Sequence, residues 1–218
     1  IVIVTHVNPD GDAMGSSLAL CLFAKKLGLE ARVIVPNDYP KFLAWMPSVQ
    51  DVLIFDKNTE EAVKIMTEAE LFCYLDFNTP SRTGLMHNEL CHLNKTPRLL
   101  IDHHIGAEIS QFVACYSDTE VSSTSEMVAE IVKYQGFDEF LDDDIATNII
   151  VGMITDTGTF SHSIFKNTTQ YPVQIKVWLD ETMLYGKIRC NQPLNEKYRI
   201  IEEDNHYFIM DIEVYNED

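Results

Sequence analysis

Short apolar runs alternate along this chain with longer segments in which apolar residues recur every three or four positions. The short runs are rich in β-branched residues and too short for helices, so they predict buried strands at residues 1–7, 31–36, 52–56, 71–77, 98–104 and 111–117. Helical spacing predicts helices at residues 13–27, 40–46, 60–69, 122–134 and 142–153. Strands that alternate with helices predict an α/β fold, in which a mainly parallel sheet carries helices on both faces.

The pattern becomes irregular after about residue 165. Residues 207–215 alternate like a strand, but no second compact set of elements emerges from residues 166–218. We therefore expect one domain over residues 1–165, followed over 166–218 by a connecting segment and an incomplete, smaller second domain. Because Ile1 already lies in a strand pattern, we also expect the native start to lie upstream.

Composition restricts the compartment and the partners. The chain has 218 residues, of which 46% are hydrophobic, and no apolar run approaches the roughly 18 residues of a membrane helix. Five cysteines without a CxxC spacing favour a reduced, cytoplasmic protein, and Cys21, Cys73 and Cys115 lie in apolar runs as small hydrophobes. The net charge of −18 argues against binding long duplex nucleic acid, which needs a basic face.

Candidate metal ligands stand where the apolar runs end. They are His6, Asp10 and Asp12 in THVNPDGDAMGS, Asp76 in YLDFNT, His103 and His104 in IDHH, and Asp156 in ITDTGTF. Ligands of parallel sheets bind beyond the carboxyl ends of the strands, so we expect these side chains to line one cleft. Carboxylates and imidazoles together suit a pair of Mn²⁺ or Mg²⁺ ions.

Single motifs also have purely structural interpretations. HVNPDGDAMGS fits a capping turn with His6 packed in the core, and Asp76 alone fits a cap on the next turn. A helix that begins after Asp12 would also point its free N–H groups toward the expected cleft. The joint occurrence of the four motifs in this order favours the metal site.

The IDHH segment is the most specific of the four. Adjacent histidines on a strand alternate in direction, so we expect one of His103 and His104 to face the metal and the other to face solvent or substrate. Asp102 can orient an imidazole through a hydrogen bond. Arg82 in TPSRTG is a candidate phosphate contact, with an ordinary surface arginine as the alternative.

HVNPDGDAMGS, LDFNTPSR, IDHH and GMITDTGTF resemble the four motifs of the DHH phosphoesterase superfamily, over about residues 1–165. The first two are most similar to the branch of nanoRNases and pAp phosphatases, which includes exopolyphosphatase-related proteins. The resemblance implies hydrolysis by two-metal water activation, with Mn²⁺ preferred and Mg²⁺ or Co²⁺ as alternatives.

The resemblance also implies individual roles. Six residues would bind the two ions: His6 and Asp10 the first, Asp12, His103 and Asp156 the second, and Asp76 both. His104 would contact the scissile phosphate or assist the leaving group, and Asp102 would support the histidines, so the catalytic group is His104, Asp76 and Asp102. His104 would also bind the substrate, and Arg82, which is a candidate from its own sequence context and not from the resemblance, is the second expected substrate-binding residue.

The hypothesis that follows is a manganese-dependent phosphoesterase that hydrolyses short oligonucleotides or pAp. The alternatives are an inorganic pyrophosphatase or exopolyphosphatase, and a non-catalytic, metal-dependent nucleotide binder. Proteins of the nanoRNase type carry a GGGH signature in a C-terminal substrate domain, and this sequence has none. We expect no membrane partner, and a homodimer remains open.

Overall fold

Six strands form one parallel sheet. They are β1 (Val2–Val4), β2 (Arg32–Val35), β3 (Leu53–Ile54), β4 (Phe72–Leu75), β5 (Arg98–Asp102) and β6 (Ala114–Ser117). Their order is β3-β2-β1-β4-β5-β6 and every pairing is parallel, which confirms the predicted sheet. The order reverses between β1 and β4, and such a reversal is the place at which open α/β sheets bind ligands.

The computed structural model describes residues 1–159 together with β7 (Arg199–Glu203) and β8 (His206–Met210). β7 and β8 pair with each other in antiparallel fashion, and β8 overlaps the first part of the segment 207–215 predicted to alternate like a strand. The rest of residues 166–218 lies outside the described residues. The domain boundary at residue 165 therefore stays a prediction.

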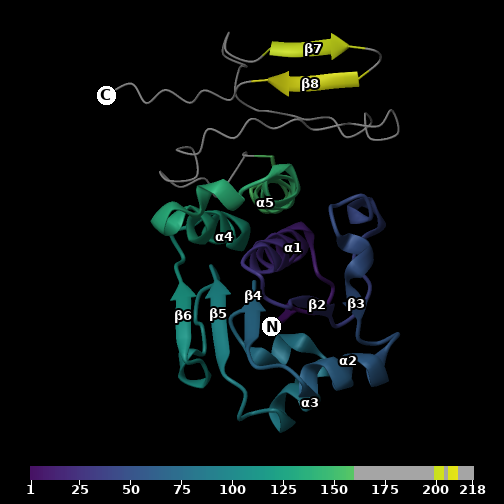
Figure 1. Ribbon diagram of the computed structural model, residues 1–218, viewed down its shortest axis with the longest axis vertical. Helices are drawn as coiled ribbons and strands as arrows, with labels where there is room; N and C mark the ends of the chain where they lie inside the picture. The colour runs from purple at the N-terminus through teal and green to yellow at the C-terminus, as the bar shows by residue number, and fades with distance from the viewer. Residues whose placement is uncertain (160–198, 204–205, 211–218) are drawn as a thin grey trace.

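Helices cover both faces of the sheet, as predicted (Figure 1). α1 (Gly11–Lys26), α4 (Thr124–Lys133) and α5 (Asp143–Asp156) lie on one side, and α2 (Thr59–Thr67) and α3 (Met86–His92) lie on the other. Short 3₁₀ turns lie in the connections between strands and helices, at Lys41–Leu43, Val49–Asp51, Pro80–Thr83, Ile109–Gln111 and Tyr134–Phe140.

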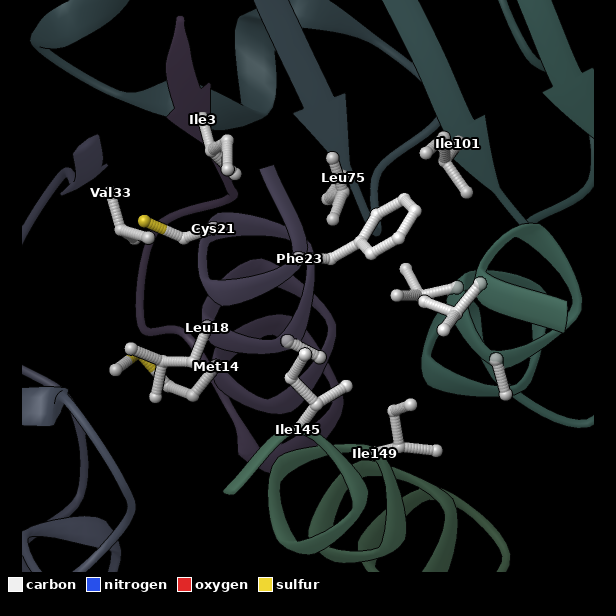
Figure 2. Close-up of a cluster of buried hydrophobic side chains, with 14 of the residues drawn as sticks. Ile3, Met14, Leu18, Cys21, Phe23, Val33, Leu75, Ile101, Ile145 and Ile149 are labelled. Carbon is white, nitrogen blue, oxygen red and sulfur yellow. The ribbon is translucent and has the colours of Figure 1, made fainter. Parts of the chain in front are cut away.

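Successive side chains of a strand point to opposite faces of the sheet, so a separate hydrophobic core lies on each face. Ile3, Leu75 and Ile101 point toward α1, whose far side packs on α5 (Figure 2). Val4 and Tyr74 point the other way and join the cluster beneath α2 and α3. Because both faces are covered, the strands of the sheet read as continuous apolar runs rather than as alternating ones.

The first helix begins earlier than predicted, at Gly11 rather than after Asp12. The side chain of Asp10 caps it by accepting hydrogen bonds from the backbone N–H groups of Asp12 and Ala13. Asp12 therefore lies inside the first turn of α1, where the helix backbone fixes its direction.

Two short elements differ from the prediction. The expected helix over residues 40–46 is only the 3₁₀ turn Lys41–Leu43. α3 was not predicted, because it has seven residues and buries only Met86 and Leu90, which is too short a pattern to read.

The expectation for one cysteine is wrong. Cys21 and Cys73 are buried, but Cys115 is exposed because β6 is an edge strand of the sheet. Within the described part of the chain, no helix combines the length and the apolar character that crossing a bilayer requires.

Candidate metal centre

The first imidazole of the site enters from the loop after β1. His6 is buried, and its Nδ1 lies 2.8 Å from the carbonyl oxygen of Val7. Since a carbonyl can only accept, Nδ1 carries the proton and Nε2 keeps its lone pair. Nε2 lies 3.5 Å from Oδ2 of Asp76 and 4.0 Å from Oδ2 of Asp10.

The two carboxylate oxygens of Asp10 have different roles, one in capping a helix and one in the candidate site. Oδ1 caps α1, and Oδ2 faces His6. The loop bends at Asn8, whose φ of +53° is in the left-handed region. Asn37 holds this bend by accepting from the backbone N–H of Asn8 and by donating to its side-chain oxygen, both at 2.7 Å. The turn that presents Asp10 is therefore anchored to the end of β2.

The carboxylate of Asp12 is held by the start of another helix. Asp12 is buried, and its two oxygens accept hydrogen bonds from the backbone N–H groups of Thr124 at 2.7 Å and of Ser125 at 2.8 Å. These N–H groups belong to the free amino end of α4, which favours a negative charge. Helix α4 thus fixes the orientation of Asp12.

Asp76 lies in the middle of the cluster. It follows β4 with a left-handed backbone, φ +67°, and its N–H donates to the carbonyl of Ile101 at 3.0 Å. Its Oδ1 accepts from the hydroxyl of Thr124 at 3.0 Å and lies 3.6 Å from Nε2 of His103. Because its other oxygen faces His6, this one buried carboxylate joins the two halves of the site.

His103 presents its Nε2 to the second half. Its Nδ1 lies 3.4 Å from the carbonyl oxygen of Val121, so the proton belongs on Nδ1 here as well. Nε2 lies 3.9 Å from Oδ2 of Asp12 and 3.7 Å from Oδ2 of Asp156.

His104 contacts Asp102 rather than a backbone carbonyl. Its Nδ1 lies 2.7 Å from Oδ1 of Asp102, which is buried, and 3.8 Å from Oδ1 of Asp76. The histidine pair lies beyond the end of β5, where alternation no longer applies, so both imidazoles approach Asp76. His104 is the more accessible one, with 35% of its side chain exposed against 16% for His103.

Asp156 is the last residue of α5 and not part of the turn predicted after Met153. Its carboxylate reaches the site because α5 crosses α1 closely: a Cβ at Gly11 would lie 2.3 Å from Oγ1 of Thr155. The structure therefore brings together His6, Asp10, Asp12, Asp76, His103, His104 and Asp156.

Buried carboxylates crowd together in the cluster, and burial, with this crowding, raises their pKa values. Burial raises the pKa of Asp12, and burial followed by the charge of Asp12 raises the pKa of Asp76 well above its usual range. The same two causes raise the pKa of Asp156 to about 6. Burial also lowers the pKa of His6, which favours its neutral, ligating form. Divalent cations would relieve this crowding of carboxylates.

The donor atoms fit a pair of such cations. Ligand atoms within 4.8 Å of one another form two groups of three, namely His6, Asp10 and Asp76 in one and Asp12, His103 and Asp156 in the other. Asp76 also groups with both His103 and His104. Imidazole nitrogen with carboxylate oxygen is a donor set suited to Mn²⁺ and similar ions.

Arg82 lies beside the half of the site that contains His6. Its carbonyl accepts from the N–H of Val7 at 2.8 Å, and its side chain is half-buried. Its positive charge is one of the smaller causes that lower the pKa of His6, after burial. The Arg82 side chain thus lies close enough to affect the charge of His6.

The sequence did not reveal the residues that hold the ligands. Thr124 and Ser125 were not singled out, although a signal existed: Ser123 is the N-cap of α4, and its hydroxyl accepts from the N–H of Glu126. That cap places the start of α4 at Thr124. The carbonyl groups that orient His6 and His103 have no sequence signal.

Comparison with known proteins assigns the class. A family model described as the DHH family, N-terminal domain, matches residues 1–153, so the chain belongs to the DHH family. The crystal structure of an exopolyphosphatase-related protein from Bacteroides fragilis superposes with a TM-score of 0.70 and 40% identity, over 74% of this chain and 47% of that one.

Several curated proteins are similar in sequence. The bifunctional oligoribonuclease and PAP phosphatase NrnA of Thermus thermophilus is 33% identical over 85% of this chain and 50% of its own length. The cyclic-di-AMP phosphodiesterase GdpP of Geobacillus thermodenitrificans is 25% identical over 86% and 29%. A probable manganese-dependent inorganic pyrophosphatase of Streptococcus mutans is 26% identical over 72% and 48%. The chain thus spans half or less of each relative's length.

Proposed function

We propose that this protein is a metal-dependent phosphoesterase that uses two divalent ions, with Mn²⁺ preferred, to hydrolyse short oligonucleotides or pAp. The observation that carries the proposal is the position of Asp76. Its two oxygens face His6 on one side, at 3.5 Å, and His103 on the other, at 3.6 Å, so one carboxylate can serve two ions. Pairs of divalent ions would supply here the chemistry that phosphatases and nucleases with two metal ions use for in-line displacement at phosphorus.

Bound ions would supply a lowered pKa for coordinated water and would neutralise charge on the phosphoryl oxygens. The chain supplies the remaining parts. Asp102 accepts from Nδ1 of His104 at 2.7 Å, so a doubly protonated His104 would have its Nε2–H to donate to a phosphate oxygen or the leaving group. Arg82 would bind a second phosphate oxygen beside His6.

The choice of substrate rests on the relatives. NrnA of Thermus thermophilus, which is named for oligoribonucleotides and PAP, supports a short nucleotide substrate. A pyrophosphatase or exopolyphosphatase is the second candidate, favoured by the similarity to the Streptococcus mutans protein. A reduced, cytoplasmic setting agrees with this substrate and stays a prediction.

The test is a set of parallel assays on the full-length protein with Mn²⁺, using pApA, pAp, pyrophosphate and cyclic di-AMP. We expect hydrolysis of pApA and pAp at rates well above that of the other two. Asp76→Asn, which suits the left-handed backbone but removes the charge, should abolish turnover on every substrate. Asp38→Asn, at an exposed ion pair with Lys57, is the matched control and should retain it.

The outcomes separate the alternatives. If the protein hydrolyses only pyrophosphate, it is a pyrophosphatase and the proposed nucleotide substrate is wrong. If the protein binds pAp in a metal-dependent way but turns over none of the substrates, it is a nucleotide-binding protein and not an enzyme. Near-normal turnover by Asp76→Asn would contradict the shared carboxylate as the basis of the site.

A further inference from the structure

One residue at the start of α4 contacts two of the proposed metal ligands. The backbone N–H of Thr124 donates to Oδ2 of Asp12 at 2.7 Å, and its hydroxyl donates to Oδ1 of Asp76 at 3.0 Å. We infer that Thr124 is a positioning residue that fixes the shared carboxylate of Asp76 relative to Asp12, so that both ions can bind together. This inference rests on the proposed two-metal site.

The Thr124 hydroxyl donates to the Asp76 oxygen that faces the half of the site containing His103. Oδ1 of Asp76 is the oxygen that faces Nε2 of His103, and Oδ2 faces His6. A carboxylate can rotate about its last side-chain bond, and a charge-assisted hydrogen bond to one oxygen restricts that rotation. Thr124 is fully buried, so water does not replace its hydroxyl at low cost.

The position of Thr124 is set independently of the acids it holds. Ser123 caps α4, and the carboxylate of Glu126 accepts from the backbone N–H of Ser122 at 3.0 Å. These contacts fix the start of α4 without involving the metal-binding aspartates. The hydroxyl of Thr124 can be removed while its N–H, and with it the bond to Asp12, stays in place.

This separation defines the variants. Thr124→Val keeps the shape and the backbone N–H but removes the hydroxyl, and Thr124→Ser keeps the hydroxyl. Thr59→Val is the matched control: its hydroxyl donates to the carbonyl of Phe55 at 2.8 Å, at the start of α2 on the other face of the sheet.

The measurement is equilibrium binding of Mn²⁺ to the full-length protein, followed by the electron paramagnetic resonance signal of free Mn²⁺. Removal of a hydrogen-bond partner of a metal ligand weakens metal binding by about 10- to 100-fold, so we expect one of the two ions to bind that much more weakly to Thr124→Val. Thr124→Ser should restore most of the affinity, and Thr59→Val should bind like the wild type. If Thr124→Val does not fold, Thr124→Ala removes the same hydroxyl.

Three results would overturn the inference or its basis. Wild-type affinity for both ions in Thr124→Val would show that the hydroxyl does not position Asp76. Equal weakening in Thr124→Ser would show that packing, and not the hydrogen bond, is responsible. Failure of the wild type itself to bind two ions would instead overturn the proposed function.

Discussion

Two backbone carbonyls decide which nitrogen each metal-facing imidazole offers. Val7 and Val121 accept from Nδ1 of His6 and His103, and in both rings Nε2 is left for the site. The residue types of the cluster could be predicted from the sequence, because four motifs of histidine and aspartate occur together in one order, although each alone fits a structural role. The tautomers could not, since any residue supplies a carbonyl.

His104 differs because a carboxylate, not a carbonyl, holds its Nδ1. Asp102→Asn would put an amide in that place and weaken the stabilisation of a protonated His104. We expect a fall in kcat of about 10- to 100-fold with little change in Mn²⁺ affinity, measured by steady-state kinetics on pApA. A loss of Mn²⁺ binding equal to the loss of kcat would show that Asp102 acts on the metal site instead.

At the scale of elements, three helices meet at contacts that only glycine permits. A Cβ at Gly152 of α5 would lie 1.9 Å from the Ser125 hydroxyl of α4 and 2.8 Å from Oδ1 of Asp12. The sequence predicted each of these helices, but not that they cross beside the metal ligands. Hydrophobic spacing reports the face that a helix buries and not the helix that it meets.

Gly152→Ala should therefore disturb both the packing and the site. Overpacking of this kind costs about 1–3 kcal/mol, which should lower the urea midpoint of unfolding. Because the added methyl group also presses on Asp12, Mn²⁺ binding should weaken. Thr147→Ala, a half-buried position on the same helix, is the control. Unchanged stability together with unchanged Mn²⁺ binding would contradict the close crossing.

At the scale of the whole molecule, the strand order is what gathers the ligands. Alternating strands and helices predicted a mainly parallel sheet, which is confirmed. The reversal between β1 and β4 could not be read, because the pairing of strands depends on which apolar faces meet in space. That reversal opens the space into which the loops after β1, β4 and β5 converge.

The buried acids should make folding stability depend on pH and metal. In the metal-free protein, the pKa of Asp156 is about 6 against an ordinary value of 3.8, so the folded state keeps a proton that the unfolded state releases. Stability should therefore fall as pH rises from about 4 through about 6, and Asp12 and Asp76 act in the same direction.

Chelator-treated protein, unfolded in urea at pH 5 and at pH 7, tests this expectation. The Asp156→Asn variant should show a smaller decline, and added Mn²⁺ should restore stability at pH 7 by about 2.7 kcal/mol for each bound ion at a hundredfold excess over its dissociation constant. Metal-free protein that is more stable at pH 7 than at pH 5, with no difference in Asp156→Asn, would contradict it.

The left-handed backbone of Asp76 limits which mutations this position can survive. Aspartate, asparagine and glycine adopt that conformation readily, and only aspartate among them carries a charge. Glutamate would keep the charge but would strain the chain and extend the carboxylate into its neighbours. The position therefore has no conservative replacement, because every other residue gives up either the negative charge or the unstrained backbone.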